Sequence, residues 1–256
     1  MDLTQDLAHG KVEQGEEVEA PLLVHRRRPV PVPRAPQARI VLASASPRRR
    51  ELLTRAGIRF AVVEPPPDPS LPAGVCADLG CQITARQKAV AAAGQVTSGT
   101  FVVAGDTVVV GPRGALGKPG TPEVALRMLA QLRGSRHTVL TGVCVVVAGS
   151  ETERLGVSRS LVRMRDFSDA ELVAYVASGE PLDKAGAYAV QGLGGDLVEA
   201  VSGRVDTVIG LDVALVLRLL AEAGYPHPLP KATDVALQPT RRERRPLAPM
   251  RATQRA

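Results

Sequence analysis

Apolar runs separated by short polar, glycine-containing or proline-containing segments dominate the middle of the chain. The run at residues 39–43 predicts a buried strand, and the valine-rich runs at residues 101–110, 137–147 and 155–164 predict three more. Residues 59–63 predict another short strand. Five strands are therefore expected.

Helix-capping residues mark several predicted helix starts between these strands. Ser46 suits the N-cap position and Pro47 the first helical position that follows it. Ser168 and Glu171 have the spacing of a capping box. The predicted helices cover residues 47–56, 79–93 and 208–223, with two more that begin at residues 121–122 and 168–171. Because strands and helices alternate and no internal repeat is visible, the pattern predicts a mixed α/β domain.

The two ends of the chain differ from the middle. Residues 26–36 are so rich in proline that they cannot form a helix or a central strand. From Pro226 onward, prolines and arginines again alternate, with too few apolar residues to offset the entropy of ordering. We therefore expect a flexible extension at residues 1–37, a folded domain at residues 38–225 and a flexible basic tail at residues 226–256.

Composition is typical of a globular protein built on aliphatic side chains. Hydrophobic residues make up 45% of the 256 residues and aromatic residues only 2%, so valine, leucine, alanine and isoleucine must form the core. A chain that is disordered throughout is excluded. Cys76, Cys81 and Cys144 form no CxxC pair, and histidine is too scarce to complete a zinc site, so we expect reduced thiols.

No targeting or membrane segment is expected. The first 21 residues are acidic and contain no basic start followed by an apolar core, which argues against a signal peptide. No apolar run approaches the roughly 18 residues that a membrane helix requires. We therefore expect a cytoplasmic protein without a membrane partner.

The net charge of +6 is concentrated near the C-terminus. Residues 226–256 carry seven basic and two acidic side chains, whereas residues 1–37 carry five basic and six acidic ones. The folded core is therefore close to balanced. The arginine-rich residues 241–245 suggest either contact with nucleic acid or a solvated tail, and the solvated tail is the favoured interpretation.

The segment that joins the first strand to the first helix has the features of a phosphate site. Residues 44–50 combine two serines and three arginines with the free backbone N–H groups of a helix N-terminus. The alternative is a well-capped helix whose arginines face solvent, and these residues alone do not decide between the two. The segment is not a P-loop, because GxxxxGK[ST] is lacking.

Other candidate groups are weaker when each is taken alone. Asp106 lies in an apolar run, where it is either a metal ligand or general base, or a turn or strand-end aspartate bonded to backbone. Lys118 and Lys184 lie beside glycine- or proline-containing segments and suit point-charge contacts with phosphate. The glycines that follow Gln191 allow a ligand to approach the backbone closely.

Taken together, these segments form five motifs in one unbroken order. The motifs are LASASPRR at residues 42–49, AGDT at 104–107, LGKP at 116–119, HTVLTGV at 137–143 and EPLDKAGAY at 180–188. This combination resembles the Maf family of nucleotide pyrophosphatases over nearly all of residues 38–225. The two ends of the chain lie outside the resemblance.

The resemblance implies an α/β fold, a single elongated domain with a central mixed sheet flanked by helices and a nucleotide cleft, similar to inosine triphosphate pyrophosphatases. It also implies hydrolysis of the α–β phosphoanhydride bond of a nucleoside triphosphate, the expected partner, with Mg²⁺ or Mn²⁺ as cofactor. Asp106 matches the catalytic aspartate, as proton acceptor or as a metal-bound group that positions water. The positions matching the triphosphate-binding residues are Ser44, Arg48, Arg49, Lys88, Lys118 and Lys184.

Three positions imply a preference for pyrimidines. Arg48, Thr107 and Gln191 match the branch of the family that favours dTTP and UTP. The neutral Gln191 amide can both donate to and accept from a uracil or thymine edge. The 7-methyl-GTP branch of the family instead has Trp, Gln and Glu at these positions. A glutamate and an aromatic face suit the cationic 7-methylguanine base.

The chain also departs from the family pattern. Pro69 stands where a second acidic residue usually follows Asp68, so Asp68 or Glu64 is the expected additional metal ligand beside Asp106. Residues 203–212 lack the Ser-Tyr pair and the final proline common there. The alternatives are a pyrophosphatase of purine triphosphates such as ITP or XTP, and a non-enzymatic regulator associated with division or nucleic acid. A homodimer is an open alternative to a monomer.

Overall fold

The computed structural model describes residues 39–67 and 74–230. The strands are β1 (Ile40–Ala43), β2 (Ala61–Val63), β3 (Phe101–Gly111), β4 (Gly114–Leu116), β5 (Arg136–Val147), β6 (Glu153–Met164) and β7 (Val198–Ser202). The α-helices are α1 (Pro47–Arg55), α2 (Ala77–Ala93), α3 (Pro122–Leu132), α4 (Asp169–Ala177), α5 (Val205–Ile209) and α6 (Val213–Glu222). The short 3₁₀ helices are η1 (Glu180–Asp183), η2 (Ala185–Ala187) and η3 (Leu193–Leu197).

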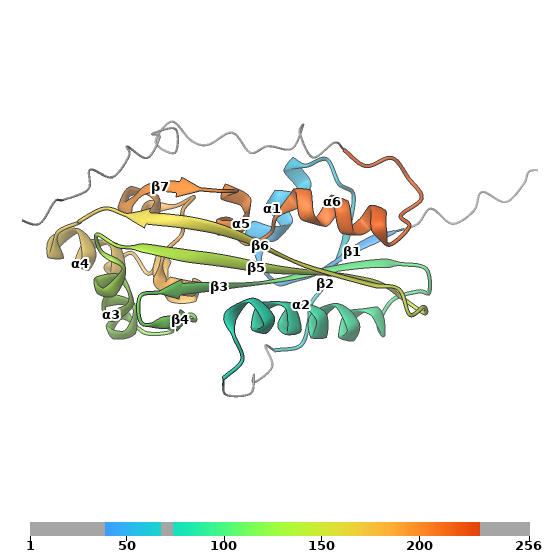
Figure 1. The fold of residues 1–256 in the computed structure, drawn as a ribbon, viewed down its shortest axis with the longest axis horizontal. Coiled ribbons are helices and arrows are strands. Elements are labelled where there is room, and N and C mark those ends of the chain that lie inside the picture. Colours follow the sequence, from blue (N-terminus) through green and yellow to red (C-terminus); the bar gives the residue numbers. More distant parts are fainter. Residues whose placement is uncertain (1–38, 68–73, 231–256) are drawn as a thin grey trace, which may run out of the picture. The chain divides into compact units, whose positions relative to one another are not determined.

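The strands form one mixed sheet, in the order β2-β1-β3-β5-β6-β7 with β4 attached to β3 (Figure 1). β1 pairs in parallel with both β2 and β3, whereas the remaining pairs are antiparallel. The chain leaves β1 through α1 to reach β2, and then returns through α2 past β1 to reach β3. Because these two crossovers run in opposite directions and both are expected to be right-handed, α1 and α2 must lie on opposite faces of the sheet.

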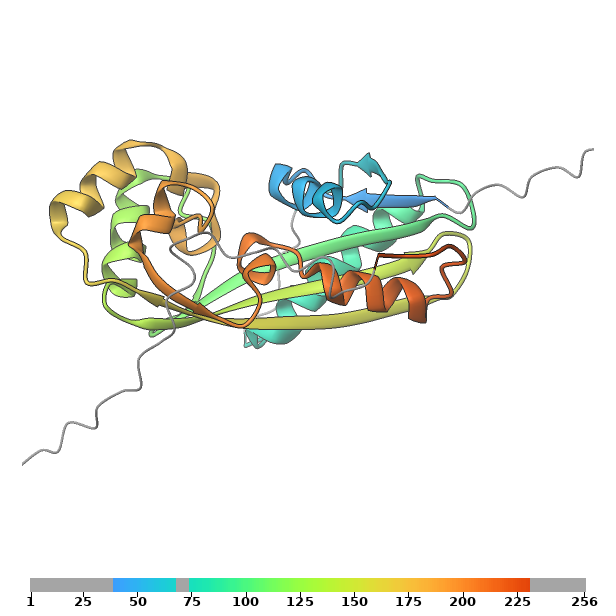
Figure 2. The ribbon, with the colours of Figure 1, turned by 90° about the horizontal axis from the view of Figure 1, so that it is seen from above.

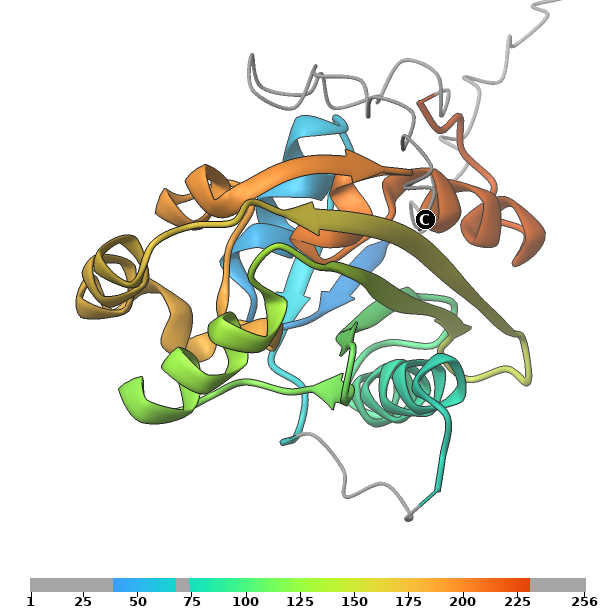
Figure 3. The same ribbon diagram turned by 60° about the vertical axis from the view of Figure 1, so that its left-hand side comes forward.

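Helices accordingly cover both faces (Figures 1 and 3). Leu42 and Val103 belong to a large core cluster that includes Leu52 of α1, whereas Ala104 belongs to a smaller cluster that includes Ala89 of α2. Successive side chains of a strand point to opposite faces, which explains why neighbours on β3 join different clusters. The expected mixed α/β fold, with a central mixed sheet flanked by helices, is confirmed.

Most predicted elements are confirmed, with ends shifted by a few residues. The capping box of α4 is present, because Ser168 Oγ accepts from the Glu171 backbone N–H at 3.2 Å and Glu171 Oε2 accepts from the Ser168 backbone N–H at 2.8 Å. Ser46 occupies the N-cap of α1, as predicted, but its side chain makes no capping hydrogen bond. The run at residues 101–110 continues through its polar pair as one strand.

The single helix predicted at residues 208–223 is wrong. The segment contains the end of α5 and the whole of α6, separated by a sharp corner (Figure 2). Gly210 has a φ of 135°, a conformation that other residues rarely adopt. Asp212 then starts α6 by accepting a hydrogen bond from the Leu215 N–H at 3.0 Å. The apolar pattern is compatible with helix on both sides and therefore did not reveal the break.

Helix α2 approaches β5 unusually closely at Gly142. A β-carbon at this position would lie 2.5 Å from the carbonyl oxygen of Cys81, which belongs to α2. No real side chain can occupy that distance from a helix backbone. Glycine at residue 142 is therefore required by the packing of α2, which also carries Lys88.

The ends of the chain are described only in part, whereas all three cysteines are described. The extension expected at residues 1–37 lies outside the described residues, as do residues 231–256 of the tail expected at residues 226–256. Within the described part of that tail, Leu229 packs against the larger core cluster. Cys76, Cys81 and Cys144 are free, as expected. Among the helices that the structure describes, none has the length and apolar character needed to span a membrane.

His137 is buried at the start of β5 beneath the segment that follows η2. Its Nε2 lies 2.8 Å from the Tyr188 hydroxyl, and its Nδ1 has no hydrogen-bond partner among the described residues. Burial lowers the pKa of His137 to about 4, from an ordinary value of 6.5. The folded protein therefore holds this imidazole neutral, whereas the unfolded chain takes up a proton below pH 6.5.

This difference predicts a loss of stability in mild acid. Between pH 6.5 and pH 4 the unfolded state binds more protons at His137 than the folded state, so the free energy of unfolding falls as the pH falls. From pH 7 to pH 5 this contribution amounts to about 2 kcal/mol. Urea unfolding measured at pH 7 and at pH 5 gives the loss in free energy of unfolding between the two pH values. This loss should be about 2 kcal/mol larger in the parent than in His137→Gln. Equal losses would contradict the assignment.

Candidate functional site

Five of the predicted site residues lie where β1 ends and β3 continues, namely Ser44, Arg49, Lys88, Asp106 and Thr107. Ala43 is in register with Val63 on one side and with Ala104 on the other. Ser44 and Glu64 therefore follow the last paired residues of β1 and β2. Ligands of open α/β sheets bind outside the carboxyl ends of parallel strands, so this edge is the position where a ligand is expected.

Arg49 is fixed at this edge by contacts from three segments. Its Nε donates to the carbonyl oxygen of Gly210 at 2.7 Å. Its Nη1 donates to Ser44 Oγ at 3.4 Å, and its Nη2 donates to Thr107 Oγ1 at 3.2 Å. Ser44, which is 2% exposed, also accepts from the backbone N–H of Ser46 at 3.2 Å. Three of the predicted residues are thus joined in one cluster that suits an anion.

Lys88 and Asp106 form a second cluster on the other face of β3. Lys88 Nζ donates to Asp106 Oδ1 at 2.9 Å, and the two side chains are only 8% and 16% exposed. The strand alternation that directs Thr107 toward α1 directs Asp106 toward α2. Burial, followed by the charges of Asp106 and Asp78, raises the pKa of Cys81 to about 12, so this neighbouring thiol stays protonated.

Arg48, Lys118 and Lys184 lie on three segments, two of which are tied together. The carbonyl oxygen of Gly117 accepts from the Gly186 N–H at 3.1 Å, which joins the loop of Lys118 to that of Lys184. Lys184 forms an ion pair with Asp183. Burial has the largest single effect on the pKa of Asp183 and raises it. The positive charges of Lys184 and then of Arg48 lower this pKa, and their combined effect is larger, so the net shift is downward. Arg48 therefore acts electrostatically on the loop of Lys184.

Gln191 is exposed on a glycine-containing loop that Glu180 holds in position. Glu180 Oε2 accepts from the Leu193 N–H and its Oε1 from the Gly194 N–H, both at 3.0 Å. The Tyr175 hydroxyl also donates to Glu180 Oε1 at 2.9 Å. The sequence alone did not predict this role of Glu180. The one available signal was that Glu180 belongs to the motif at residues 180–188.

The metal ligands expected beside Asp106 are described only in part. Asp68 lies outside the described residues, and Glu64 is exposed just after β2. Within residues 39–67 and 74–230, no group of three or more carboxylate, thiol or imidazole side chains is arranged to enclose a metal ion. Asp106 can therefore contribute a carboxylate to a shared site, but the described side chains do not build a closed cage.

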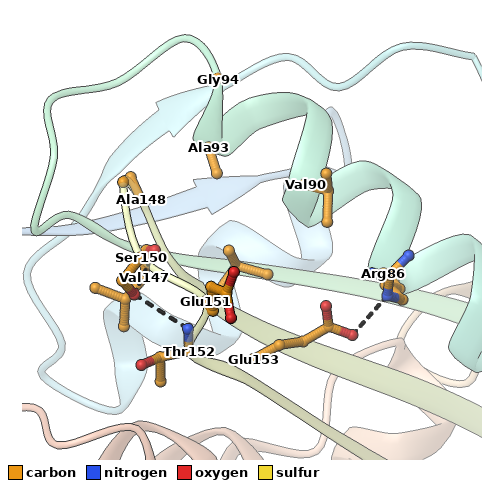
Figure 4. Close-up of a pocket in the computed structure, with 12 residues that line it drawn as sticks. Arg86, Val90, Ala93, Gly94, Val147, Ala148, Ser150, Glu151, Thr152 and Glu153 are labelled. Carbon is orange, nitrogen blue, oxygen red and sulfur yellow. Dashed lines mark hydrogen bonds and ion pairs between the residues drawn. The ribbon is translucent and has the colours of Figure 1, made fainter.

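A surface hollow elsewhere contains none of the predicted site residues (Figure 4). It has a volume of about 410 Å³ and lies between the C-terminal half of α2 and the turn that joins β5 to β6. Arg86 Nε donates to Glu153 Oε1 across it at 2.6 Å. This ion pair links α2 to the hairpin of β5 and β6. The hollow is separate from the residues predicted to bind phosphate.

Comparisons with known proteins agree with the motifs. A family model described as "Maf-like protein" matches residues 39–223. A dTTP/UTP pyrophosphatase of Anaeromyxobacter sp. (strain Fw109-5) is 48% identical over 193 residues, which cover 74% of this chain and 92% of that protein. A dTTP/UTP pyrophosphatase of Myxococcus xanthus (strain DK1622) is 46% identical over 194 residues, 76% of this chain and 97% of that protein. The solved Staphylococcus aureus Ham1 protein aligns with a TM-score of 0.41 and 16% identity, over 72% of this chain and 98% of that one.

Proposed function

Because the chain belongs to the Maf-like protein family, we propose that it hydrolyses dTTP and UTP to the corresponding monophosphate and pyrophosphate. The observation that carries this proposal is the pairing of two clusters along β3. The buried Lys88–Asp106 pair and the Arg49–Ser44–Thr107 cluster are contributed by adjacent residues of one strand. A carboxylate suited to activate water and groups suited to hold phosphate therefore come from successive residues of β3, on opposite faces of the sheet and just beyond the point where β1 ends.

The side chains divide the work of the reaction. Arg48, Arg49, Lys118 and Lys184 bind the triphosphate and offset its charge. Asp106 accepts the proton of the attacking water or orients that water toward the α-phosphorus. Lys88 fixes the direction of the Asp106 carboxylate through its hydrogen bond of 2.9 Å. Water attack then breaks the α–β bond and pyrophosphate leaves.

We infer that a divalent cation is shared between Asp106 and the substrate. Mg²⁺ is commonly held by one or two carboxylates together with water and substrate phosphates, and Asp106 supplies one such carboxylate. Asp106, with Asp68 or Glu64, would hold Mg²⁺ or Mn²⁺. When bound, the cation would neutralise charge on the phosphate oxygens and orient them.

A nucleotide panel tests the function. The purified full-length protein is incubated with dTTP, UTP, dCTP, ITP and XTP in Mg²⁺ or Mn²⁺, and pyrophosphate release is measured. We expect the highest kcat/KM with dTTP and UTP. Preferential hydrolysis of ITP or XTP would favour the purine alternative, and no hydrolysis of any triphosphate would favour the non-enzymatic regulator.

Gln191 supports the pyrimidine preference and gives a sharper prediction. The Gln191→Glu variant loses the amide donor, and a buried base carbonyl would then face a carboxylate. We expect kcat/KM for dTTP and UTP to fall by about tenfold or more, which corresponds to the loss of one hydrogen bond to substrate. Leu193→Ala, on the same exposed loop, is the control. Unchanged kcat/KM in Gln191→Glu would remove this residue from base recognition.

Three further expectations concern the location of the protein and its partners. We infer a cytoplasmic location, supported by free cysteines of the kind that reducing compartments maintain. A homodimer remains a prediction that sedimentation would test. Nucleic-acid binding by the arginines of residues 241–245 remains the less favoured interpretation, and those residues lie outside the described ranges.

A further inference from the structure

A group of three charged side chains, two of them buried carboxylates, lies next to the Arg49–Ser44–Thr107 cluster. Arg204 donates to both oxygens of Asp206, through Nε at 3.0 Å and through Nη2 at 2.6 Å. The same Nε lies 3.0 Å from Asp212 Oδ1. Asp206 and Asp212 are 2% and 5% exposed, whereas the Arg204 side chain is 34% exposed. We call these three residues the ion triad.

The ion triad is not expected to add much to the stability of the fold. Removing two carboxylates and a guanidinium from water is costly, and buried ion pairs often contribute no more to stability than apolar residues of similar volume would. What the triad does fix is the corner between α5 and α6. Asp206 accepts from the backbone N–H groups of Thr207 at 3.0 Å and Val213 at 3.1 Å, one on each side of that corner.

The corner carries the carbonyl group that orients Arg49. The backbone N–H of Gly210 donates to the Asp206 carbonyl oxygen at 2.9 Å. The Gly210 carbonyl oxygen in turn accepts from Arg49 Nε at 2.7 Å and from Thr107 Oγ1 at 3.4 Å. The direction of this carbonyl group depends on the unusual φ of 135° at Gly210. A shift of the corner would therefore move the Arg49 guanidinium.

A second chain of hydrogen bonds leads from the ion triad to Thr107. Ser158 Oγ donates to Asp212 Oδ2 at 2.6 Å and lies 2.7 Å from Thr207 Oγ1. The Thr207 carbonyl oxygen accepts from Thr141 Oγ1 at 2.8 Å. Thr141 Oγ1 lies 3.0 Å from Thr107 Oγ1. Both routes thus lead to Arg49 and Thr107, which the proposed function places at the phosphate-binding cluster.

We propose that Arg204, Asp206 and Asp212 are positioning residues of the substrate site, which hold Arg49 and Thr107 in the geometry that binds the nucleotide. The inference rests on the proposed function. None of the three needs to touch substrate, because each acts through Gly210 or Thr207. Interactions that hold a substrate-binding group in place contribute to binding and rate even when they lie behind it.

Kinetics of matched variants test this role. Asp212→Asn retains a good N-cap for α6 but removes the charge that Arg204 contacts. Arg204→Gln removes the positive charge, whereas Arg204→Lys retains it. We expect KM for dTTP to rise about tenfold in Asp212→Asn and Arg204→Gln with kcat within about threefold, and partial recovery in Arg204→Lys. The control is Arg163→Gln, which breaks the Arg163–Glu199 pair at a similar side-chain exposure of 35%.

A double-mutant cycle separates positioning from general loss of stability. If the ion triad acts through Arg49, adding Arg204→Gln to Arg49→Lys should raise KM much less than Arg204→Gln does in the parent. Additive effects, or equal effects of Arg163→Gln and Arg204→Gln, would overturn the proposal. So would a parent-like KM in both Asp212→Asn and Arg204→Gln.

A spectroscopic measurement keeps this proposal distinct from the proposed function. The Arg49 Nε–H signal in a ¹⁵N–¹H correlation spectrum, assigned by its loss in Arg49→Lys, reports the hydrogen bond to Gly210 without substrate. We expect Arg204→Gln to shift that signal and Arg163→Gln to leave it in place. Failure of the parent to hydrolyse any nucleotide would overturn the proposed function, whereas an unshifted signal would overturn the positioning role.

Discussion

Asp106→Asn should reduce kcat for dTTP by about three orders of magnitude, within the range that general acid–base groups contribute. The amide has nearly the shape of the carboxylate and can still accept the hydrogen bond from Lys88, so the fold should survive. It cannot take a proton from water, and it is a weaker ligand for a hard cation. Steady-state kinetics with dTTP in saturating Mg²⁺ measure the effect, and KM should change far less than kcat.

The control for this variant is Asp78→Asn. Asp78 also forms an ion pair, because its Oδ1 lies 2.7 Å from Nη2 of Arg159. Unlike the Lys88–Asp106 pair, this pair is exposed, near the start of α2. Its replacement should leave kcat within about twofold, because exposed ion pairs contribute little. If Asp106→Asn retained kcat within threefold of the parent, Asp106 would not be the group that activates water, whatever the substrate.

Gly142→Ala should destabilise the fold by about 3 kcal/mol, at the upper end of the usual cost of inserting one methyl group into a packed interior. The added β-carbon would lie 2.5 Å from the Cys81 carbonyl oxygen, and helix backbone cannot relax as a flexible side chain can. α2 must then move away from β5 and take Lys88 with it. Chemical denaturation measures the loss of stability, and the kcat of the folded fraction should fall as well.

Gly94→Ala provides the matched control. Gly94 follows α2, and a β-carbon there would lie 3.6 Å from the Ala91 carbonyl oxygen, an ordinary contact. Its φ of −69° suits alanine, so stability should change by less than about 1 kcal/mol. Equal stability of Gly142→Ala and Gly94→Ala would show that α2 is not held against β5 as tightly as the structure indicates.

Local sequence features predicted the elements well where capping or apolar runs were strong. The α4 capping box and the buried runs of β3 and β5 each depend on neighbours a few residues apart, and these are visible in the chain itself. The break at Gly210 was missed because a glycine in an apolar helical pattern is tolerated often enough to be ambiguous. Gly210 is held by the nearby Asp206 carbonyl group and by Arg49 of α1, and the contact with Arg49 is not visible in the local sequence.

The site was predictable as a set of residues but not as an arrangement. The motifs identified Ser44, Arg49 and Asp106, and the structure brings the first two together. Their division between two faces of the sheet depends on the pairing of β3, which no short motif records. Glu180 and the ion triad were missed because their contacts join residues of irregular segments, at spacings that no helix or strand period marks.

The alternation of side chains along β3 has a consequence for how this site can change. Insertion or deletion of one residue between Phe101 and Asp106 would slip the strand register and turn Asp106 toward Arg49 and Thr107 toward Lys88. Point substitutions can adjust either face separately, but length changes in this strand exchange them. Length variation should therefore be confined to the loops around β3, while the spacing from its first residue to Asp106 stays fixed.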